Sequence, residues 1–249
     1  TYLAVYVLFH IFLLAFLIFS LLKDNRWRSE LKRKILGASY AVLLLLDLFI
    51  LYHTQTRGAI LGLIGGVFAA ALWLAIFSPR HGGARRLASG AIVAIVVLTG
   101  LFFAARESNF VKNNPTLSRL AAISPNEQTI RSRLMIWRMS WQGFKERPVL
   151  GWGPENYTVV FNKYYNPLMY DQEQWFDRAH NVFFDWLIVA GILGLLSYLA
   201  LFGIVIYYLF KLRRAEPLAV IDQALIVGLL AAYFFNNLFV FDQLISLLF

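Results

Sequence analysis

Long apolar runs constrain this chain more than any other feature of its sequence. Each is about 20 residues long, the length that an α-helix needs to cross the hydrocarbon core of a bilayer. They lie at residues 1 to 22, 35 to 52, 58 to 77, 87 to 104, 183 to 210 and 218 to 236. Because 59% of the 249 residues are apolar and only 15% are charged, a water-soluble globule of this size is excluded. The sequence therefore predicts an all-α polytopic membrane protein with about six transmembrane helices.

The runs divide the chain into three parts. We expect four transmembrane helices in residues 1–104, a long extramembrane segment in residues 105–182, and two transmembrane helices in residues 183–249. The first run has no initiating Met and no basic leader before it, which is unlike a signal peptide. We therefore expect the chain to begin inside a longer membrane protein.

Lysine and arginine are concentrated in three short connections between the runs. Residues 23–34 hold six of them, and residues 79–86 and 211–214 hold three each. Six spans place all three connections on one side of the membrane. Short cytoplasmic loops carry an excess of Lys and Arg, so we expect that side to be cytoplasmic and residues 105–182 to face outward.

Composition also excludes several classes of function. The formal net charge is +9, but the basic residues are scattered among apolar spans and form no soluble basic face, so we expect no nucleic-acid partner. The chain has no cysteine, which excludes disulfides, thiolate catalysis and cysteine metal sites. No HExxH, paired Asp, P-loop or dinucleotide glycine pattern is present, so we expect neither a metal ion nor a cofactor.

The outer segment contains one strongly helical stretch, at about residues 125–147. Ser124-Pro125-Asn126-Glu127 has the pattern of a capping box with Pro at the first helical position, and Pro148 follows the stretch. Its apolar positions at helical spacing are Ile130, Leu134, Trp137, Trp141 and Phe144. This narrow apolar stripe predicts an amphipathic helix that lies on a membrane or bundle surface.

Three arginines project from the flanks of this helix. Arg131 and Arg138 share one flank of the stripe, and Arg133 projects from the other. A guanidinium group matches phosphate oxygens in a bidentate way and stays charged, so these side chains are candidates for binding the phosphates of a lipid carrier. The alternative is that each arginine only snorkels from an ordinary amphipathic helix.

Two further patterns follow the helix. The segment from Pro148 to Pro154, PVLGWGP, predicts a fixed turn with positions for positive φ. His180-Asn181 stands at the outer mouth of the fifth span. An imidazole near a helix N-terminus is kept neutral by the helix dipole, which suits a general base. The alternative is that His180 only caps the helix or contacts lipid headgroups.

Two charged residues mark the outer ends of earlier spans. Arg57, in Thr56-Arg57-Gly58, lies in the first turn of the third span, where backbone N–H groups can also hold an anion. Asp47 lies inside the second span, about five residues from its outer end, where an ionisable group has a partner or a function. We expect Arg57 or a loop arginine to be that partner. We expect Asp242, after the last span, to place another carboxylate at the outer membrane face.

The order of these patterns resembles the O-antigen ligase and polymerase superfamily, the WaaL/Wzy-type membrane glycosyltransferases. The features that carry the resemblance, in chain order, are Thr56-Arg57-Gly58, the glycines Gly62, Gly65 and Gly66, Arg133-Leu134-Met135-Ile136-Trp137, the PVLGWGP segment, His180-Asn181, and Gly191-Ile192-Leu193-Gly194. The likeness covers roughly residues 35–245.

The resemblance implies transfer of a glycan from undecaprenyl diphosphate to an acceptor hydroxyl, without a metal ion. In the ligase branch the acceptor is the lipid A-core, and the reaction takes place on the periplasmic face of the bacterial inner membrane, among membrane lipids. The resemblance also assigns roles to individual residues. It implies that His180 is the catalytic base, that Arg57 and Arg133 bind the diphosphate with Arg131 and Arg138 as second choices, and that Asn181 and Asp47 support the site.

Two alternatives stay open. A Wzy-type polymerase has the same motifs but extends a second carrier-linked glycan. A non-enzymatic transporter or lipid-binding scaffold would need charged groups along a path through the bundle. The enzyme hypothesis needs Arg57, Arg133 and His180 to meet in one cavity.

Overall fold

A computed structural model describes residues 2–23, 30–124, 127–170, 174–215 and 219–240. Within these ranges every regular element is a helix, which confirms the all-α class. Six helices of the described chain are long and apolar enough to cross a membrane, as the sequence predicts. Contacts divide the chain into two compact units. Unit 1 includes Thr1–Ala121 and Leu209–Asn236, and unit 2 includes Ala122–Tyr208 and the segment from Asn237.

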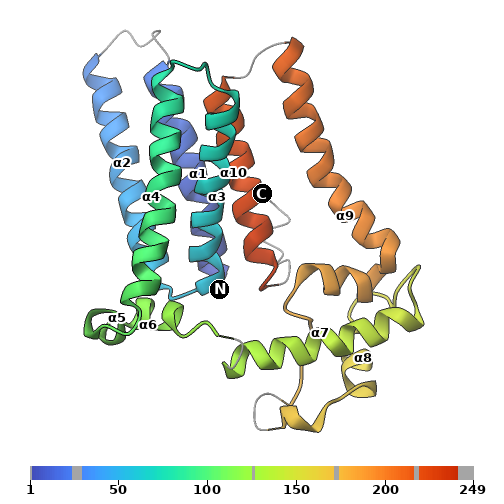
Figure 1. The fold of residues 1–249 in the computed structure, drawn as a ribbon. Helices are drawn as coiled ribbons and strands as arrows, with labels where there is room; N and C mark the ends of the chain where they lie inside the picture. The colour runs from blue at the N-terminus through green and yellow to red at the C-terminus, as the bar shows by residue number, and fades with distance from the viewer. Residues whose placement is uncertain (1, 24–29, 125–126, 171–173, 216–218, 241–249) are drawn as a thin grey trace. The chain divides into compact units, whose positions relative to one another are not determined.

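Unit 1 is built mainly from long apolar helices that run side by side (Figure 1). Its elements are α1 (Tyr2–Lys23), α2 (Glu30–His53), α3 (Arg57–Phe77), α4 (Gly83–Ala105), the short α5 (Asn109–Asn113) and α6 (Pro115–Ala121), and α10 (Val220–Asn237), of which the last residue belongs to unit 2. These five long helices lie over five of the six predicted apolar runs. α2 and α4 begin four or five residues before their apolar runs, because long basic side chains in the first turn reach past the end of the run.

Small residues bring α3 and α10 together. A Cβ added at Gly66 would lie 2.5 Å from the carbonyl oxygen of Gly228, and one added at Gly62 would lie 2.8 Å from that of Ala232. In a bilayer, helices associate through close backbone packing, which small residues permit. Two of the glycines that carry the family resemblance therefore form a helix–helix contact.

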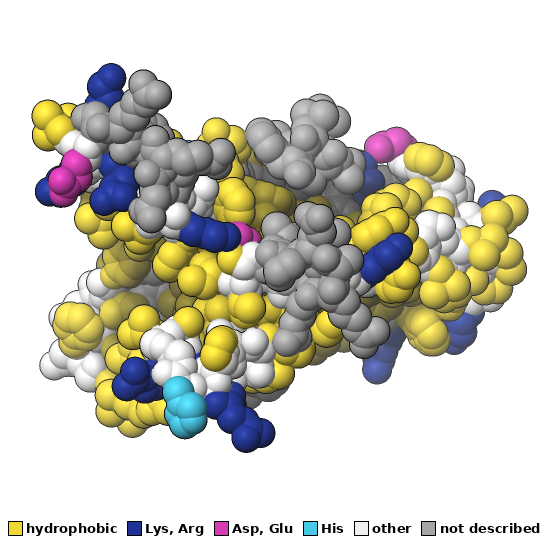
Figure 2. All heavy atoms as spheres, turned by 90° about the horizontal axis from the view of Figure 1, so that it is seen from above, with side chains coloured by type: hydrophobic (Ala, Val, Ile, Leu, Met, Phe, Trp, Pro, Cys, Tyr) yellow, Lys and Arg dark blue, Asp and Glu magenta, His cyan; other side chains and the backbone are white. Residues whose placement is uncertain are grey.

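The described helix ends that flank the basic connections lie at one end of unit 1 (Figure 1). Lys23 at the end of α1 forms an ion pair of 3.9 Å with Asp222 in the first turn of α10, so the last helix starts beside the end of the first. The α3–α4 connection lies at the same end (Figure 1), as six alternating spans require. Viewed from above, Lys and Arg side chains stand in separate patches among apolar ones (Figure 2). The cytoplasmic assignment of this end stays a prediction.

Unit 2 has a core that α7, α8 and the start of α9 build together. Its elements are α7 (Gln128–Glu146), α8 (Tyr157–Lys163), the 3-10 helix η1 (Pro167–Met169) and most of α9 (Val182–Ala215). The buried residues of the core are Ile136, Met139, Tyr157, Val160, Phe161, Met169, Phe176, Ala179 and Ile188.

Helix α7 forms where the sequence predicts an amphipathic helix, but its start and its buried face differ. The helix begins after Glu127, whose side chain makes no capping hydrogen bond, so the predicted cap at Ser124 is wrong. Pro125 and Asn126 of the predicted capping box lie outside the described residues.

The predicted apolar stripe is buried only in part, since Leu134 and Trp141 are 51% and 48% exposed. The buried face instead contains Ser140 and Gly143. A Cβ at Gly143 would strike the side chain of Val160 on α8. Small residues, and not the largest apolar ones, therefore mark the face on which α8 packs.

Helix α9 covers the predicted fifth run from 183 to 210, but it is interrupted at Gly191, which the sequence did not predict. Gly191 has φ 63° and ψ −158°, and α9 bends in Figure 1. The part of α9 before Gly191 belongs to the core of unit 2 through Ile188. About 20 residues remain from Ile192 to Lys211, enough to cross a bilayer.

Candidate functional site

The loop before α9 presents His180 at the start of that helix. Asn181 caps the helix, because its side-chain oxygen accepts hydrogen bonds from the backbone N–H groups of Phe183 (3.0 Å) and Phe184 (3.3 Å). His180 itself has φ 52°, in the left-handed region that residues other than glycine rarely adopt. The predicted position of His180 beside a helix N-terminus is therefore confirmed.

Side chains from two helices hold the residue that precedes His180. The indole Nε1 of Trp137 on α7 donates a hydrogen bond of 3.2 Å to the carbonyl oxygen of Ala179. The backbone N–H of Ala179 donates one of 2.6 Å to Oδ1 of Asp185 on α9. Ala179 is fully buried. The rings of Phe176 and His180 pack edge to face, with their centroids 5.4 Å apart. The backbone at His180 is thus held by the core of unit 2.

The imidazole of His180 contacts a backbone carbonyl. Its Nδ1 lies 3.3 Å from the carbonyl oxygen of Arg178, and a carbonyl oxygen only accepts hydrogen bonds. Nδ1 is therefore the donor in this contact. In a neutral imidazole with the proton on Nδ1, Nε2 is the acceptor that a histidine base uses.

Arg133 belongs to the same region of unit 2. Its guanidinium carbon lies 6.0 Å from the centre of the Phe239 ring. The neighbouring residue, Leu238, accepts a hydrogen bond of 2.9 Å from the side-chain amide of Asn181. One turn further along α7, Trp137 contacts Ala179. Arg133 and Asn181, the residue after His180, therefore contact adjacent residues of one short segment, Leu238–Phe239.

The other candidate arginines have different surroundings. Arg131 and Arg138 are exposed on α7, whereas Arg133 is partly buried, so the structure separates Arg133 from the two second choices. Arg57 is partly buried at the first residue of α3, in unit 1. Its meeting with His180 stays a prediction.

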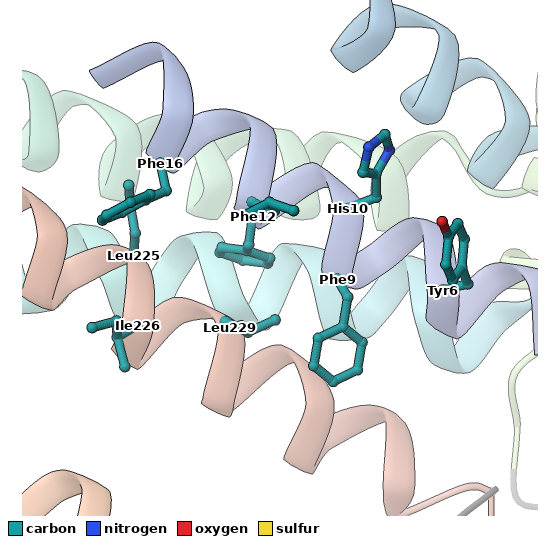
Figure 3. A pocket seen from close by; sticks show the side chains of 9 residues that line it. Tyr6, Phe9, His10, Phe12, Phe16, Leu225, Ile226 and Leu229 are labelled. Atoms are coloured by element: carbon teal, nitrogen blue, oxygen red, sulfur yellow. The ribbon is translucent and has the colours of Figure 1, made fainter. Parts of the chain in front are cut away.

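The predicted partner of Asp47 is wrong. Asp47 lies 2.6 Å from the imidazole Nδ1 of His10 on α1, and neither Arg57 nor a loop arginine takes this place. The reason is that α1 packs along α2 in unit 1 and carries an imidazole at the same depth as the carboxylate. His10 also lines an apolar groove of about 410 Å³ between α1 and α10, with Phe12 and Leu229 among its walls (Figure 3). Asp242 lies outside the described residues.

The PVLGWGP segment docks into the interruption of α9. The backbone N–H groups of Trp152 and Gly153 donate to the carbonyl oxygens of Ile188 (2.6 Å) and Val189 (3.0 Å), which end the first part of α9. Carbonyls at a helix end need such partners. In return the N–H of Ile192 donates to the oxygen of Pro148 at 2.8 Å.

Glycine is needed on both sides of this contact. Gly151 and Gly153 have φ of 70° and 93°, as the turn prediction requires. A Cβ on Gly151 would lie 2.7 Å from the nitrogen of Gly191 and would strike the oxygen of Ile188. Two motifs that seem independent in the sequence therefore form one structural element.

A charged cluster joins the end of α7 to α8. Lys163 donates to Oε2 of Glu146 at 2.6 Å, and the hydroxyl of Tyr164 donates to the other oxygen. These hydrogen bonds, that of Lys163 first, lower the pKa of Glu146. The guanidinium of Arg147 lies 4.3 Å from the centre of the Trp152 ring. The cluster holds the PVLGWGP segment and α8 at the same end of α7.

Sequence reasoning missed the hydrogen bond of Trp137 to the loop, because Trp137 was assigned to the apolar stripe. For Asp185, which has no motif around it, the sequence indicated only that it orients the mouth of the fifth span. The one signal was spacing, because Asp185 lies one helical turn beyond Asn181 and shares the face of α9 that meets the loop.

Tyr157 is a further buried group of this core, with its hydroxyl 3.0 Å from that of Ser140. Burial raises the pKa of Tyr157, and the charge of Asp185 raises it further, while the hydrogen bond with Ser140 lowers it. The carboxylate of Asp185 and the hydroxyl of Tyr157 therefore influence each other inside unit 2.

A comparison with protein families gives a match to the model Wzy_C, described as O-antigen ligase, over residues 40–199. This stretch is more than half of the chain and contains Arg57, Arg133 and His180. No curated protein matches the chain. With its helices long and apolar enough to span a membrane, the chain is a multi-pass membrane enzyme of the O-antigen ligase/polymerase type and belongs to the O-antigen ligase family.

Proposed function

We propose that the protein transfers a glycan from undecaprenyl diphosphate to a hydroxyl group of the lipid A-core, on the periplasmic face of the bacterial inner membrane. One observation carries the proposal beyond the family match. Arg133 contacts Phe239, and Asn181, the residue after His180, contacts the neighbouring Leu238, so two motifs far apart in the sequence meet the same short segment of unit 2. A cationic group for the diphosphate and a base for the hydroxyl are the two groups that this reaction needs.

His180 acts as the general base in this proposal. With its proton on Nδ1, Nε2 takes the proton of the acceptor hydroxyl while the oxygen attacks the anomeric carbon. The bond from that carbon to the diphosphate oxygen breaks, and undecaprenyl diphosphate leaves with the electron pair. A single displacement of this kind inverts the anomeric configuration. A positioned base contributes about 10²- to 10⁴-fold to such a rate.

Arg133 and Arg57 bind the diphosphate in this proposal. The negative charge on the leaving group grows as the bond breaks, and fixed guanidinium groups stabilise it more in the transition state than in the ground state. The guanidinium carbon of Arg133 lies 6.0 Å from the centre of the Phe239 ring, a cation–π distance at which the charge of the group is attracted to the ring.

The test of the base is His180→Gln in purified protein with a carrier-linked glycan and lipid A-core. We expect transfer to fall by about 10²- to 10⁴-fold, with unchanged abundance in the membrane. The matched control is His81→Gln, which changes an exposed histidine in the α3–α4 connection and should leave transfer intact. Full activity of His180→Gln would refute the proposed role.

The test of the diphosphate site is Arg133→Lys. Lysine keeps the charge but loses the bidentate geometry, so we expect the KM for the carrier-linked donor to rise about tenfold, the cost of one charge-assisted hydrogen bond. Arg106→Lys is the control, since Arg106 is exposed after α4. Equal donor KM values for the two variants would contradict the role of Arg133.

The place of Arg57 can be tested by crosslinking, because the chain has no cysteine. The variant with both Arg57→Cys and His180→Cys carries only two thiols. If both residues serve one site, a short bifunctional maleimide should join them within one chain. The pair Thr54→Cys with His81→Cys is the control, since these positions lie at opposite ends of α3, and crosslinking no better than this control would remove Arg57 from the site.

The acceptor separates the ligase from the polymerase. Transfer to lipid A-core supports the proposal, whereas elongation of the glycan on its carrier, with none on lipid A-core, would assign the polymerase reaction. Solute flux in proteoliposomes without any glycan transfer would favour the transporter hypothesis instead.

Sidedness has its own test. An impermeant maleimide added to spheroplasts should label Trp175→Cys, in the exposed part of unit 2, but not His81→Cys. Both parent residues are exposed. The reverse labelling pattern would place unit 2 in the cytoplasm.

A further inference from the structure

Asp185 is a buried carboxylate one helical turn beyond the loop that carries His180. Its side chain accepts the hydrogen bond of 2.6 Å from the backbone N–H of Ala179, and Asp185 is only 8% exposed. A carboxylate inside a protein core is costly unless its charge is compensated. Here Oδ1 accepts the Ala179 N–H, and the N-terminal turn of α9 adds stabilisation, because the helix dipole favours a negative charge at that end.

The hydrogen bond of Asp185 is half of a two-sided arrangement. Trp137 on α7 donates to the carbonyl oxygen of Ala179, so side chains on two different helices hold both polar backbone groups of this residue. The next residue, His180, has φ 52°. A left-handed backbone costs about 1 kcal/mol or more for a residue with a side chain, and it persists only when its surroundings hold it there.

The direction of the imidazole depends on this backbone conformation. If the loop relaxed to negative φ, the imidazole of His180 would swing away from the carbonyl oxygen of Arg178, which its Nδ1 contacts at 3.3 Å. A displacement of about 1 Å in a reacting group costs about 100-fold in rate. The side chain that fixes the loop therefore affects the base without touching substrate.

We infer that Asp185 is the positioning residue for His180: by binding the Ala179 N–H it holds the left-handed conformation that aims the imidazole. The inference rests on the proposed function of His180. It adds to the reaction a residue on α9 that belongs to none of the motifs in the sequence.

The test compares Asp185→Ala with Asp185→Asn. Asparagine has nearly the same shape and keeps an oxygen that can accept the Ala179 N–H, whereas alanine removes the acceptor. We expect Asp185→Ala to lower kcat about 100-fold with little change in the KM for the carrier-linked donor. Asp185→Asn should retain kcat within about fivefold, since only the charge-assisted part of the hydrogen bond is lost.

The matched control is Asp177→Ala, an exposed acid in the same loop, which should change neither kinetic constant. Two results would overturn the inference. Wild-type kcat in Asp185→Ala would show that the hydrogen bond does not position the base. An Asp185→Asn variant as slow as Asp185→Ala would show that the charge matters and not the acceptor geometry.

Hydrogen exchange keeps this inference separate from the proposed function. In Asp185→Ala the amide of Ala179 should exchange roughly 10- to 100-fold faster, the factor for losing a hydrogen bond to a charged group, while the amides of α8 keep their protection. That protection shows that unit 2 stays folded. If His180→Gln is fully active while the Ala179 exchange still rises, the proposed base is wrong and the hydrogen bond stands. Unchanged exchange refutes the role of Asp185 whatever the activity.

Discussion

Replacing Gly191 by alanine should separate the PVLGWGP segment from α9. Gly191 has φ 63°, and a Cβ added there would lie 2.8 Å from the nitrogen of Leu150 and would strike the carbonyl oxygen of Val149. Both are backbone atoms, so no side-chain rotation can relieve the contact. The added methyl group must therefore push the segment out of the interruption of α9.

The size of the effect follows from the contacts that would be lost. Gly191 has φ 63° and ψ −158°, a backbone region essentially restricted to glycine, and alanine there costs about 1 kcal/mol or more. Three backbone hydrogen bonds join the segment to α9, and each contributes about 1 kcal/mol. The backbone cost and the three lost hydrogen bonds together should lower the local free energy of opening by about 4 kcal/mol.

Hydrogen exchange of the Trp152 and Gly153 amides measures this opening directly, because both donate to α9. We expect exchange at least 100-fold faster in Gly191→Ala, since each 1.4 kcal/mol corresponds to about a factor of ten. Gly203→Ala is the matched control in the same helix, because no atom lies within 4 Å of its added Cβ. Equal exchange rates in the two variants would refute the structural role of Gly191.

Three further predictions concern titratable groups. Asp47→Leu should weaken the contact between α1 and α2 by about 1 kcal/mol, the scale of an interhelical hydrogen bond in a membrane. The melting temperature in detergent should fall accordingly. Asp47→Asn keeps an acceptor for His10, so it should lower the melting temperature less than Asp47→Leu does. Because Lys163 lowers the pKa of Glu146, the contact between them stabilises the fold above the ordinary pKa of Glu and should be lost only as the pH falls through the lowered value; carboxyl chemical shifts that titrate at the ordinary value would contradict this. Burial raises the pKa of Tyr157 from its ordinary 10.0, so its phenolate absorbance should appear only at higher pH than that of exposed tyrosines, and should be missing from the difference spectrum of Tyr157→Phe.

Hydropathy and charge predict most of unit 1. Transfer of apolar surface into lipid depends on composition over about 20 residues, so α1, α3 and α10 are found within a few residues of their runs. The parity of the basic connections gives the arrangement in which α10 starts beside the end of α1, as the ion pair between Lys23 and Asp222 shows. Neither inference needs contacts between distant residues.

Side-chain partners could not be read from the sequence in the same way. The hydrogen-bonding partner of Asp47 is 37 positions away, on α1, and a search near the outer end of its own span points to Arg57 instead. The prediction that the apolar stripe forms the buried face of α7 is wrong for a related reason. Apolar spacing predicts that Trp141 is buried, but the face that packs on α8 is chosen by Gly143, which lets the two helices approach.

The order of Arg133, the PVLGWGP segment and His180 by itself determined the family and the chemistry to expect, because residue types and their spacing are local properties of the chain. Only the tertiary structure decided that the segment ends the first part of α9, that Arg133 is partly buried beside Phe239 whereas Arg131 and Arg138 are exposed, and that Asp185 holds the backbone beside His180. Each of these depends on a hydrogen bond or ring contact between residues far apart in the sequence, and such contacts exist only once packing has brought the helices together.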